Sequence, residues 1–528
     1  MQQKISIKLL PHEAADESVI KKLLAKSSGK KETEIKGFKI LKQSIDARGN
    51  SVWVNLIINT FINEPFIIDK KFAFNFPDVT KSLKSIIIIG AGPAGLFAAL
   101  KLVEKGIKPI ILERGKDVRE RRRDLAVLNK KGIINTDSNY CFGEGGAGTY
   151  SDGKLYTRSS KRGDVDKILQ LFVHFGADEN ILHEAHPHIG TNKLPQIISA
   201  MRKQIVDCGG EFLFEKKVID FEITGDTIRC VKTDNDVFNA DGYILATGHS
   251  ARDIFELLKF KNILIEAKPF AMGIRVEHPQ ALINKIQYHS DTKYDLLPPA
   301  SYSLVNQVDG KGVFSFCMCP GGIIAPAATD NGEVVVNGWS PSKRNNQFAN
   351  SGIVVQVEIK DAYKEVKNQN LKINEDDPLL LMAFQKMVEQ KAFDAGGGKF
   401  AAPAQRMIDF VENKSSVSLP QCSYLPGLNS AEMKNILPGF ITERLQKAFT
   451  LFGAKMKGYL TNEAVLVATE SRTSSPVRIP RDKIMLHHPQ LKNLFPCGEG
   501  AGYAGGIVSA AMDGERVATQ LACIIGKN

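Results

Sequence analysis

The feature that most constrains the fold is an apolar run that leads directly into a glycine-rich turn. Residues 86–89 are consecutive isoleucines, and the turn after them has the form G-x-G-x-x-G. Such β-branched runs are typical of a strand buried on both faces of a parallel sheet. Gly90 permits the tight turn, Gly92 lets backbone approach a pyrophosphate, and Gly95 lets a helix pack on the strand. The turn consists of Gly90, Ala91, Gly92, Pro93, Ala94 and Gly95.

The context of the turn strengthens this interpretation. Apolar residues recur at helical spacing over 94–105, and Gly106 is a typical helix stop. A second apolar run over 108–112 ends at Glu113, at roughly the 20-residue spacing of a ribose-binding carboxylate. A carboxylate there suits an unphosphorylated ribose, as in FAD or NAD, because it would repel a 2′-phosphate. Together these features predict a dinucleotide-binding unit.

Length and charge limit the class of protein. At 528 residues the chain is too long for one core and is expected to hold two or three domains. No apolar run approaches the roughly 18 residues of a membrane span, and the N-terminus lacks a signal core. We therefore expect a cytoplasmic protein with no membrane partner. The net charge is +11, but the lysines are spread and not interleaved with aromatic residues, so nucleic acid is not the expected partner.

The cysteines and histidines do not predict a redox pair or a metal site. Cys317 and Cys319 are separated by one residue, so they form no C-x-x-C motif, and we expect reduced thiols. His183, His186 and His188 are close in sequence, but Pro187 interrupts any helical face. No metal is predicted, and His188 is kept as a candidate active-site residue.

Changes of pattern divide the chain into three predicted domains of an α/β protein. Residues 1–80 follow the order β-α-β-β, which fits a small α+β unit of the ferredoxin-like type. Residues 81–267 and 466–528 would form a Rossmann-like nucleotide-binding domain with a parallel sheet. Residues 268–465 would form an inserted α+β domain, the usual place for substrate specificity.

Two further glycine-rich stretches satisfy the same motif in a different context. A polar segment precedes residues 143–154, so we expect a loop that lets backbone approach a flat or charged ligand. Residues 498–506 follow a short apolar run and precede a segment with helical spacing up to 525. We expect the second stretch to complete the first nucleotide site from its other side.

Three separated motifs give the chain a family resemblance. They are residues 90–95 with Glu113, residues 244–248 and residues 494–499. In these the chain resembles FAD-dependent oxidoreductases of the glutathione-reductase-like superfold that have one nucleotide-binding fold and a separate substrate domain. Residues 143–154 and 470–478 are similar to those of uncharacterised bacterial FAD-dependent dehydrogenases with a small N-terminal domain.

The resemblance implies non-covalent FAD. Its pyrophosphate would lie on residues 90–95, its ribose on Glu113 and its adenine near Val218. Glu499 would accept a ribityl hydroxyl, where the family more often has aspartate. The helix that begins near residue 505 would direct its N-terminus at the flavin N1–C2 carbonyl and stabilise the reduced anion. The other expected FAD contacts are Arg114, Gly145, Gly146, Ala147, Gly148, Thr149, Ala246, Thr247, Gly248, Gly498, Gly505, Gly506 and Ile507.

The expected activity is oxidoreduction, as a dehydrogenase or reductase that transfers hydride through flavin N5 on a small organic substrate. No second nucleotide-binding unit is found in the sequence, so any NAD(P)H would bind transiently, and disulfide reductase chemistry is not expected. Arg472 would clamp a substrate carboxylate or phosphate, or would be structural and pair with Glu470 or Asp482. Lys154 would place positive charge near the flavin or a substrate anion, or would be an ordinary surface lysine. The candidates on the substrate side are Glu470, Arg472, Thr473, Ser474, His188 and Lys154.

Two alternatives remain. The enzyme would be a flavin monooxygenase or an ene-reductase of the geranylgeranyl-reductase type. The second alternative is that the protein is a flavin-containing partner in RNA binding or modification, with largely structural FAD. The net charge and the N-terminal unit suggest this alternative.

Overall fold

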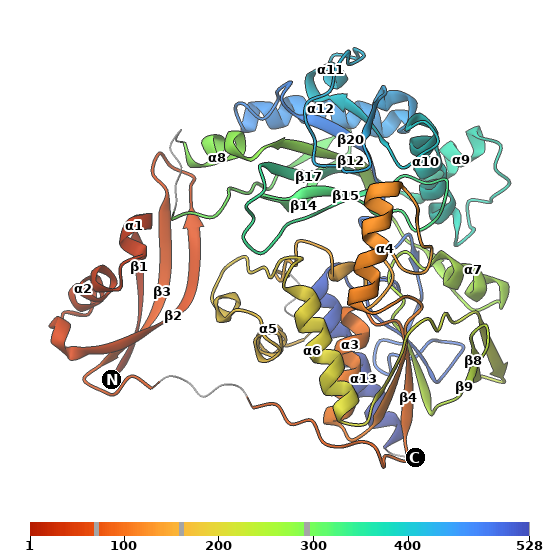
Figure 1. Ribbon diagram of the computed structural model, residues 1–528, viewed down its shortest axis with the longest axis horizontal. Coiled ribbons are helices and arrows are strands. Elements are labelled where there is room, and N and C mark those ends of the chain that lie inside the picture. The colour runs from red at the N-terminus through yellow and green to blue at the C-terminus, as the bar shows by residue number, and fades with distance from the viewer. Residues whose placement is uncertain (68–72, 158–162, 290–295, 527–528) are drawn as a thin grey trace.

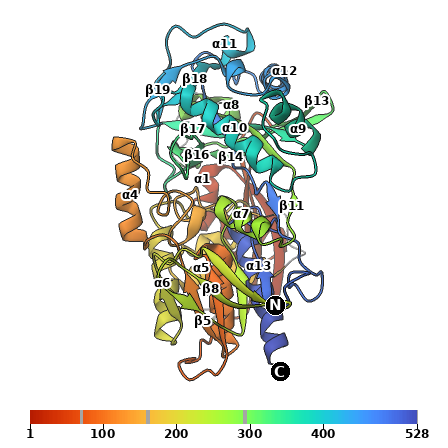
Figure 2. The ribbon, with the colours of Figure 1, turned by 90° about the vertical axis from the view of Figure 1, so that its right-hand side faces the viewer.

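Three main sheets organise the computed structural model, which describes residues 1–67, 73–157, 163–289 and 296–526. A three-stranded sheet lies to the left in Figure 1, a seven-stranded sheet at the top, and a five-stranded parallel sheet below it. Figure 2 shows the seven-stranded sheet and its helices stacked above the parallel sheet. No helix among the described residues combines the length and apolarity needed to cross a membrane.

The isoleucine run forms the central strand of the parallel sheet, as predicted. The strand order is β22-β10-β4-β5-β6, and every pairing is parallel. Ile86 and Ile88 pack into the core on one face, while Ile87 and Ile89 pack on the other. A β-branched run buried on both faces explains why this segment is a strand. The strands are β4 (Ser85–Ile89), β5 (Lys108–Leu112), β6 (Glu211–Leu213), β10 (Gly242–Leu245) and β22 (Leu494–Pro496).

Helices and a small sheet cover the two faces of the parallel sheet. α3 and α13 cross closely, because a Cβ at Gly514 would lie 2.1 Å from the carbonyl oxygen of Ala94. On the other face lie α7 and a three-stranded antiparallel sheet, β7-β8-β9. These elements are α3 (Pro93–Glu104), α5 (Val165–His174), α6 (Leu194–Asp207), α7 (Arg252–Phe260), α13 (Ile507–Ile525), β7 (Asp220–Thr224), β8 (Thr227–Lys232) and β9 (Val237–Phe238). By contrast, α4 (Val118–Lys131) extends toward the inserted domain, where Leu128 packs with Ala327 and Phe400 (Figure 1).

The seven-stranded sheet has the order β13-β14-β17-β12-β20-β18-β19 and is antiparallel except between β18 and β19. The predicted boundary between residues 465 and 466 falls at the start of β20, which pairs with β12 and β18. We therefore propose that the inserted domain includes β20. The strands are β12 (Phe270–Pro279), β13 (Val305–Val308), β14 (Lys311–Cys319), β17 (Phe348–Val357), β18 (Ala402–Arg406), β19 (Leu428–Ser430) and β20 (Val465–Glu470).

Helices and two short ribbons accompany this sheet. β16 pairs with β15 in a separate two-stranded ribbon and does not join the large sheet. The helices are α8 (Gln280–Tyr288), α9 (Ile359–Asn368), α10 (Leu380–Ala395), α11 (Met407–Val411) and α12 (Gly439–Lys455). The ribbons are β15 (Ile323–Pro326) with β16 (Val336–Trp339), and β11 (Glu266–Ala267) with β21 (Val477–Arg478).

The N-terminal unit has its own small core and the predicted β-α-β-β order. Its strand order β1-β3-β2 is that of the first three strands of a ferredoxin-like unit. The Asp16 side chain caps α2, and Gly29 ends that helix with a φ of 66°. The elements are β1 (Gln2–Leu9), α1 (Pro11–Ala14), α2 (Glu17–Ser28), β2 (Ile35–Asp46) and β3 (Trp53–Ile62).

Candidate functional site

A cavity of about 370 Å³ lies at the carboxyl ends of the parallel strands. Gly90 follows β4, Glu113 follows β5, Ala246 follows β10 and Cys497 follows β22, and all four residues line it. Open parallel sheets bind ligands at this edge. The seven-stranded sheet contributes to the cavity wall through Phe316 and Cys317 of β14.

Most of the predicted cofactor residues line this cavity. Three lie behind its surface: Gly95 packs on the Gly90 carbonyl, the Gly145 N–H donates to Ala91 at 2.9 Å, and the Thr149 hydroxyl donates to Glu144 at 2.8 Å. The lining residues among those predicted are Gly90, Ala91, Gly92, Pro93, Ala94, Glu113, Arg114, Gly146, Ala147, Gly148, Val218, Ala246, Thr247, Gly248, Gly498, Glu499, Gly505, Gly506 and Ile507.

The turn before α3 fits an anion through its backbone. Gly90 has a φ of 106°, and a Cβ there would lie 2.5 Å from the Ala246 carbonyl oxygen. A Cβ at Gly146 would come within 3.1 Å of the Gly92 Cα, so two backbone segments meet without intervening side chains. α3 begins at Pro93, whose missing N–H costs the helix nothing at that position. The remaining first-turn N–H groups form a site suited to a pyrophosphate.

Glu113 joins three loops at the cavity edge. One carboxylate oxygen accepts the Ala91 N–H at 2.9 Å, and the other accepts the N–H groups of Gly115 at 2.9 Å and Gly143 at 3.0 Å. Each carboxylate oxygen has two lone pairs, so one position remains for a ribose hydroxyl. Glu113 therefore holds the turn together as well as lining the cavity. Beside it, Arg114 pairs with Asp137 at 2.7 Å.

The loop over residues 143–154 has no strand before it, as predicted, and contains a short 3-10 turn at 146–148. Arg121 of α4 is fully buried behind it and donates to the carbonyls of Asn139 and Glu144, both at 2.8 Å. This guanidinium fixes the loop against the cavity. This role of Arg121 could not be predicted from the sequence, because its partners are main-chain carbonyls that leave no residue pattern.

At the other end of the cavity, α13 begins at Ile507 and runs for 19 residues. Its first-turn N–H groups and its dipole favour negative charge at the lining residues Gly505 and Gly506. Burial raises the pKa of Glu499 to about 7, and Lys268 opposes that shift. Asp513 accepts the Gly498 N–H at 2.8 Å, so α13 also anchors the turn before it.

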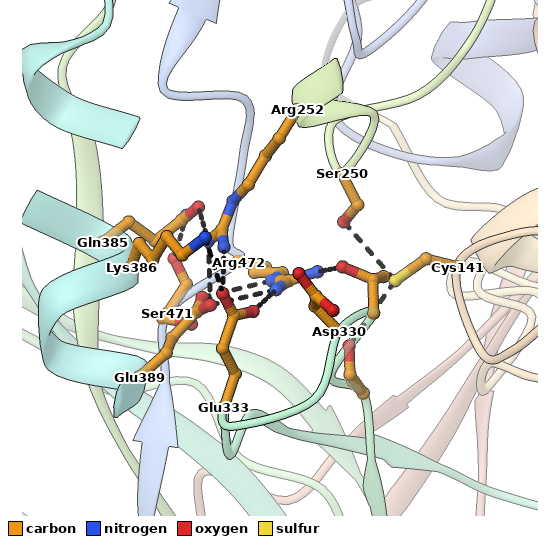
Figure 3. Close-up of polar contacts among 12 residues, drawn as sticks. Cys141, Ser250, Arg252, Asp330, Glu333, Gln385, Lys386, Glu389, Ser471 and Arg472 are labelled. Carbon is orange, nitrogen blue, oxygen red and sulfur yellow. Dashed lines mark hydrogen bonds and ion pairs between the residues drawn. The ribbon is translucent and has the colours of Figure 1, made fainter. Parts of the chain in front are cut away.

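Arg472 lines the cavity within a buried ion network (Figure 3). Its guanidinium lies 2.9 Å from Glu389 and 3.0 Å from Glu333, and Arg252 reaches the same two carboxylates. The two arginines hold the pKa of Glu389 well below its usual value despite its burial. Arg472 therefore pairs with different residues from those suggested by the sequence, since Glu470 pairs instead with Arg275 at 2.5 Å.

The other substrate-side candidates separate into two groups. Thr473 and Lys154 line the cavity, and the Thr473 hydroxyl donates to the Ala271 carbonyl at 2.7 Å. Ser474 lies outside the lining and accepts a bond from Lys268 at 3.3 Å. His188 lines a different cavity, next to the N-terminal unit, and a ring nitrogen lies 3.1 Å from the Ser342 carbonyl oxygen. Burial lowers the pKa of His188 to about 4, so it is neutral at pH 7.

Three family models match separate parts of the chain. Residues 269–473 match the model described as "FAD-dependent protein, C-terminal domain-like". Residues 84–130 match an FAD binding domain, and residues 1–61 match a domain of unknown function.

A relative in Clostridium beijerinckii, described as an uncharacterized protein, is 37% identical over 524 residues, which is 96% of each chain. Among solved structures, CtdE in complex with FAD and a substrate is 10% identical over 83% of this chain and 80% of that one, with a TM-score of 0.34. A geranylgeranyl bacteriochlorophyll reductase-like protein from Thermoplasma acidophilum is 12% identical over 84% and 80%, with a TM-score of 0.35.

Proposed function

The chain belongs to the same family as the Clostridium beijerinckii protein, among the FAD-dependent oxidoreductases, and we propose that it transfers a hydride between FAD and a small organic substrate held in the cavity. The observation that carries the proposal is the cavity itself. It extends along the carboxyl ends of the parallel strands, from the turn at residues 90–94 to the start of α13.

The residues of the parallel-sheet wall fit FAD, which supplies hydride chemistry at its flavin ring. We propose that the turn over 90–94 and the start of α3 hold the pyrophosphate, and that Glu113 accepts a ribose hydroxyl. The N-terminus of α13 would favour the anionic reduced ring. Glu499 would accept a ribityl hydroxyl, and both oxygens of its carboxyl can act as acceptors when it is ionised.

The substrate would be bound by the wall that the inserted sheet contributes. Arg472 is already neutralised by two carboxylates, which supports a positioning role more than capture of a free anion. Thr473 and Asn337 line the same cavity and offer hydrogen-bonding groups. This mixture of polar and apolar side chains favours a substrate that is a small organic molecule with a few polar groups.

The first test is the absorbance spectrum of the purified protein and of the supernatant after heat denaturation. We expect flavin bands at about one FAD per chain and release of unmodified FAD. Colourless protein that takes up no FAD on reconstitution would overturn the proposal. Turnover under ¹⁸O₂ then identifies the reaction class, since a monooxygenase would place the isotope in its product whereas a dehydrogenase or reductase would not.

A further inference from the structure

Two cysteines at the end of β14 come together beside the cavity. Cys317 lines the cavity and is half-buried, while Cys319 lies fully buried behind it. Their Sγ atoms are 3.9 Å apart. In a regular strand such residues lie on one face but roughly 7 Å apart along the chain. An irregular strand is therefore required to bring the two sulfurs so close.

The backbone of β14 provides that irregularity. The pairing of β14 with β17 shifts register between Phe316 and Cys319, and Cys317 has a φ of 45°. A left-handed conformation is uncommon for a residue other than glycine and clusters at functional sites. This bulge turns the two thiols toward each other.

Two cations face the thiols. The Lys154 ammonium lies 4.0 Å from both sulfurs, and Arg275 lies 3.7 Å from the Cys319 sulfur. Asp152, 3.4 Å from Lys154, and Glu470, paired with Arg275, are the acidic groups that balance these cations. Arg344 also pairs with Asp152, at 2.8 Å, so positive charge is in excess around the thiols.

These surroundings shift the pKa values of the two thiols in opposite directions. The hydrogen bond with Cys319, together with Lys154 and Arg275, holds the pKa of Cys317 well below its usual value. Burial raises the pKa of Cys319 well above its usual value. An accessible thiolate next to a buried thiol is the arrangement of an attacking and a resolving cysteine.

We propose that Cys317 and Cys319 form a redox-active pair that exchanges two electrons with the bound flavin. The inference rests on the proposed function, because FAD is the oxidant. Closure of the pair starts from the Cys317 thiolate and the Cys319 thiol. It breaks the one S–H bond, forms one S–S bond, and delivers two electrons and one proton to oxidised FAD, giving the anionic FADH⁻. The sulfurs must approach by about 2 Å to reach disulfide distance, within the reach of side-chain rotation. Reopening reverses every step, so the pair stores two electrons beside the ring.

The decisive experiment is an anaerobic dithionite titration of the air-oxidised holoprotein, followed by flavin absorbance. Wild type should take up four electrons per FAD, two for the ring and two for the disulfide. Cys317→Ser and Cys319→Ser should each take up two. Cys523→Ser, at an exposed thiol on α13, is the matched control and should take up four.

A second readout needs no variant of the pair. Trypsin releases residues 312–343, which contain both cysteines and no others. In oxidised holoprotein this peptide should be lighter by two hydrogen atoms and resist alkylation until dithionite is added. Lys154→Met should move the pH profile for alkylation of Cys317 in reduced protein to higher pH and slow the reaction at pH 7 roughly tenfold. Lys203→Met, at an exposed lysine, should leave the profile unchanged.

The outcomes separate this inference from the proposed function. FAD-containing protein that takes up only two electrons, with the peptide always reduced, would overturn the dithiol pair and leave the oxidoreductase proposal standing. Protein without FAD would overturn the oxidoreductase proposal and, with it, the assigned oxidant.

Discussion

The two walls of the cavity are built in different ways. The parallel-sheet wall presents backbone, with glycines where a Cβ would collide and two helix N-termini at its ends. The wall from the inserted sheet and its neighbouring loops presents side chains with balanced charges. Arg472 pairs with Glu389, which is distant in sequence, and Lys154 pairs with Asp152, two residues before it. We therefore expect substitutions that add atoms to the first wall to disturb FAD binding, and substitutions that remove a charge from the second wall to lower stability.

The largest expected effect is on the backbone wall. Gly90→Ala places a Cβ 2.5 Å from the Ala246 carbonyl at a φ of 106°, so we expect loss of bound FAD, measured as the flavin absorbance of purified protein. Gly106→Ala is the matched control, because its φ is 73° but no atom lies within 4 Å of the added Cβ. The control should cost only the roughly 1–2 kcal/mol of left-handed strain and keep its FAD. Equal FAD content in both variants would contradict the backbone description of this wall.

Removal of a charge tests the opposite wall. Arg472→Met leaves Glu333 and Glu389 with Arg252 as their arginine partner, and loss of one member of a buried network costs about 3–5 kcal/mol in the free energy of unfolding. We expect urea denaturation to show this loss while the FAD content per folded chain changes little.

The pH dependence of Arg472→Met sharpens the same test. Burial and Glu389 already raise the pKa of Glu333 to about 7 in the folded protein, and Arg472 opposes that shift, so its loss should raise the pKa of this carboxyl further. The contribution of this carboxyl to the free energy of unfolding is then fully present below pH 4.5, its unfolded pKa. That contribution is lost as the pH rises through the folded pKa of the variant. Adding Glu333→Gln should recover part of the loss at pH 8, since one of the two like charges is removed. No recovery would show that the cost comes from packing instead of charge.

Glu499 gives a smaller effect on the cofactor side. Burial raises its folded pKa to about 7, above the 4.5 of a free carboxyl, so its contribution to apoprotein stability is present below pH 4.5 and is lost as the pH rises through 7. Glu499→Gln should remove that slope, measured by thermal unfolding of apoprotein from pH 5 to 8. Glu256→Gln, at an exposed residue of α7, should retain it. An unchanged slope in the first variant would show that Glu499 is already ionised in the apoprotein.

The smallest effects separate cavity-lining from neighbouring residues. Thr473→Val removes a hydroxyl that bonds the Ala271 carbonyl, at a cost of about 1 kcal/mol, and should alter KM because the residue lines the cavity. Ser474→Ala loses one long bond to Lys268 and should change stability by less than about 0.5 kcal/mol, with unchanged KM. A change in KM for Ser474→Ala as large as that for Thr473→Val would show that Ser474 also contributes to substrate binding.

The contrast between the walls also explains what the sequence could predict. The turn at 90–95, Glu113 and the segment leading into α13 are local patterns, because strand, turn and helix are consecutive in the chain. The partners of Arg472 could not be predicted, since Glu389 is on α10 and Glu333 is in a loop of the insert. The closeness of Cys317 and Cys319 depends on a register shift against β17, which no spacing rule encodes.

The pairing of β10 with β22 and the crossing of α13 over α3 have a consequence for biosynthesis. The ribosome delivers the central strand of the parallel sheet before the insert, but the edge strand β22 and the covering helix α13 emerge after it. The nucleotide site is therefore completed only after translation of the whole insert. Until then the nascent chain exposes the part of the apolar sheet face that α13 covers, and capture of the cofactor has to follow synthesis of the insert.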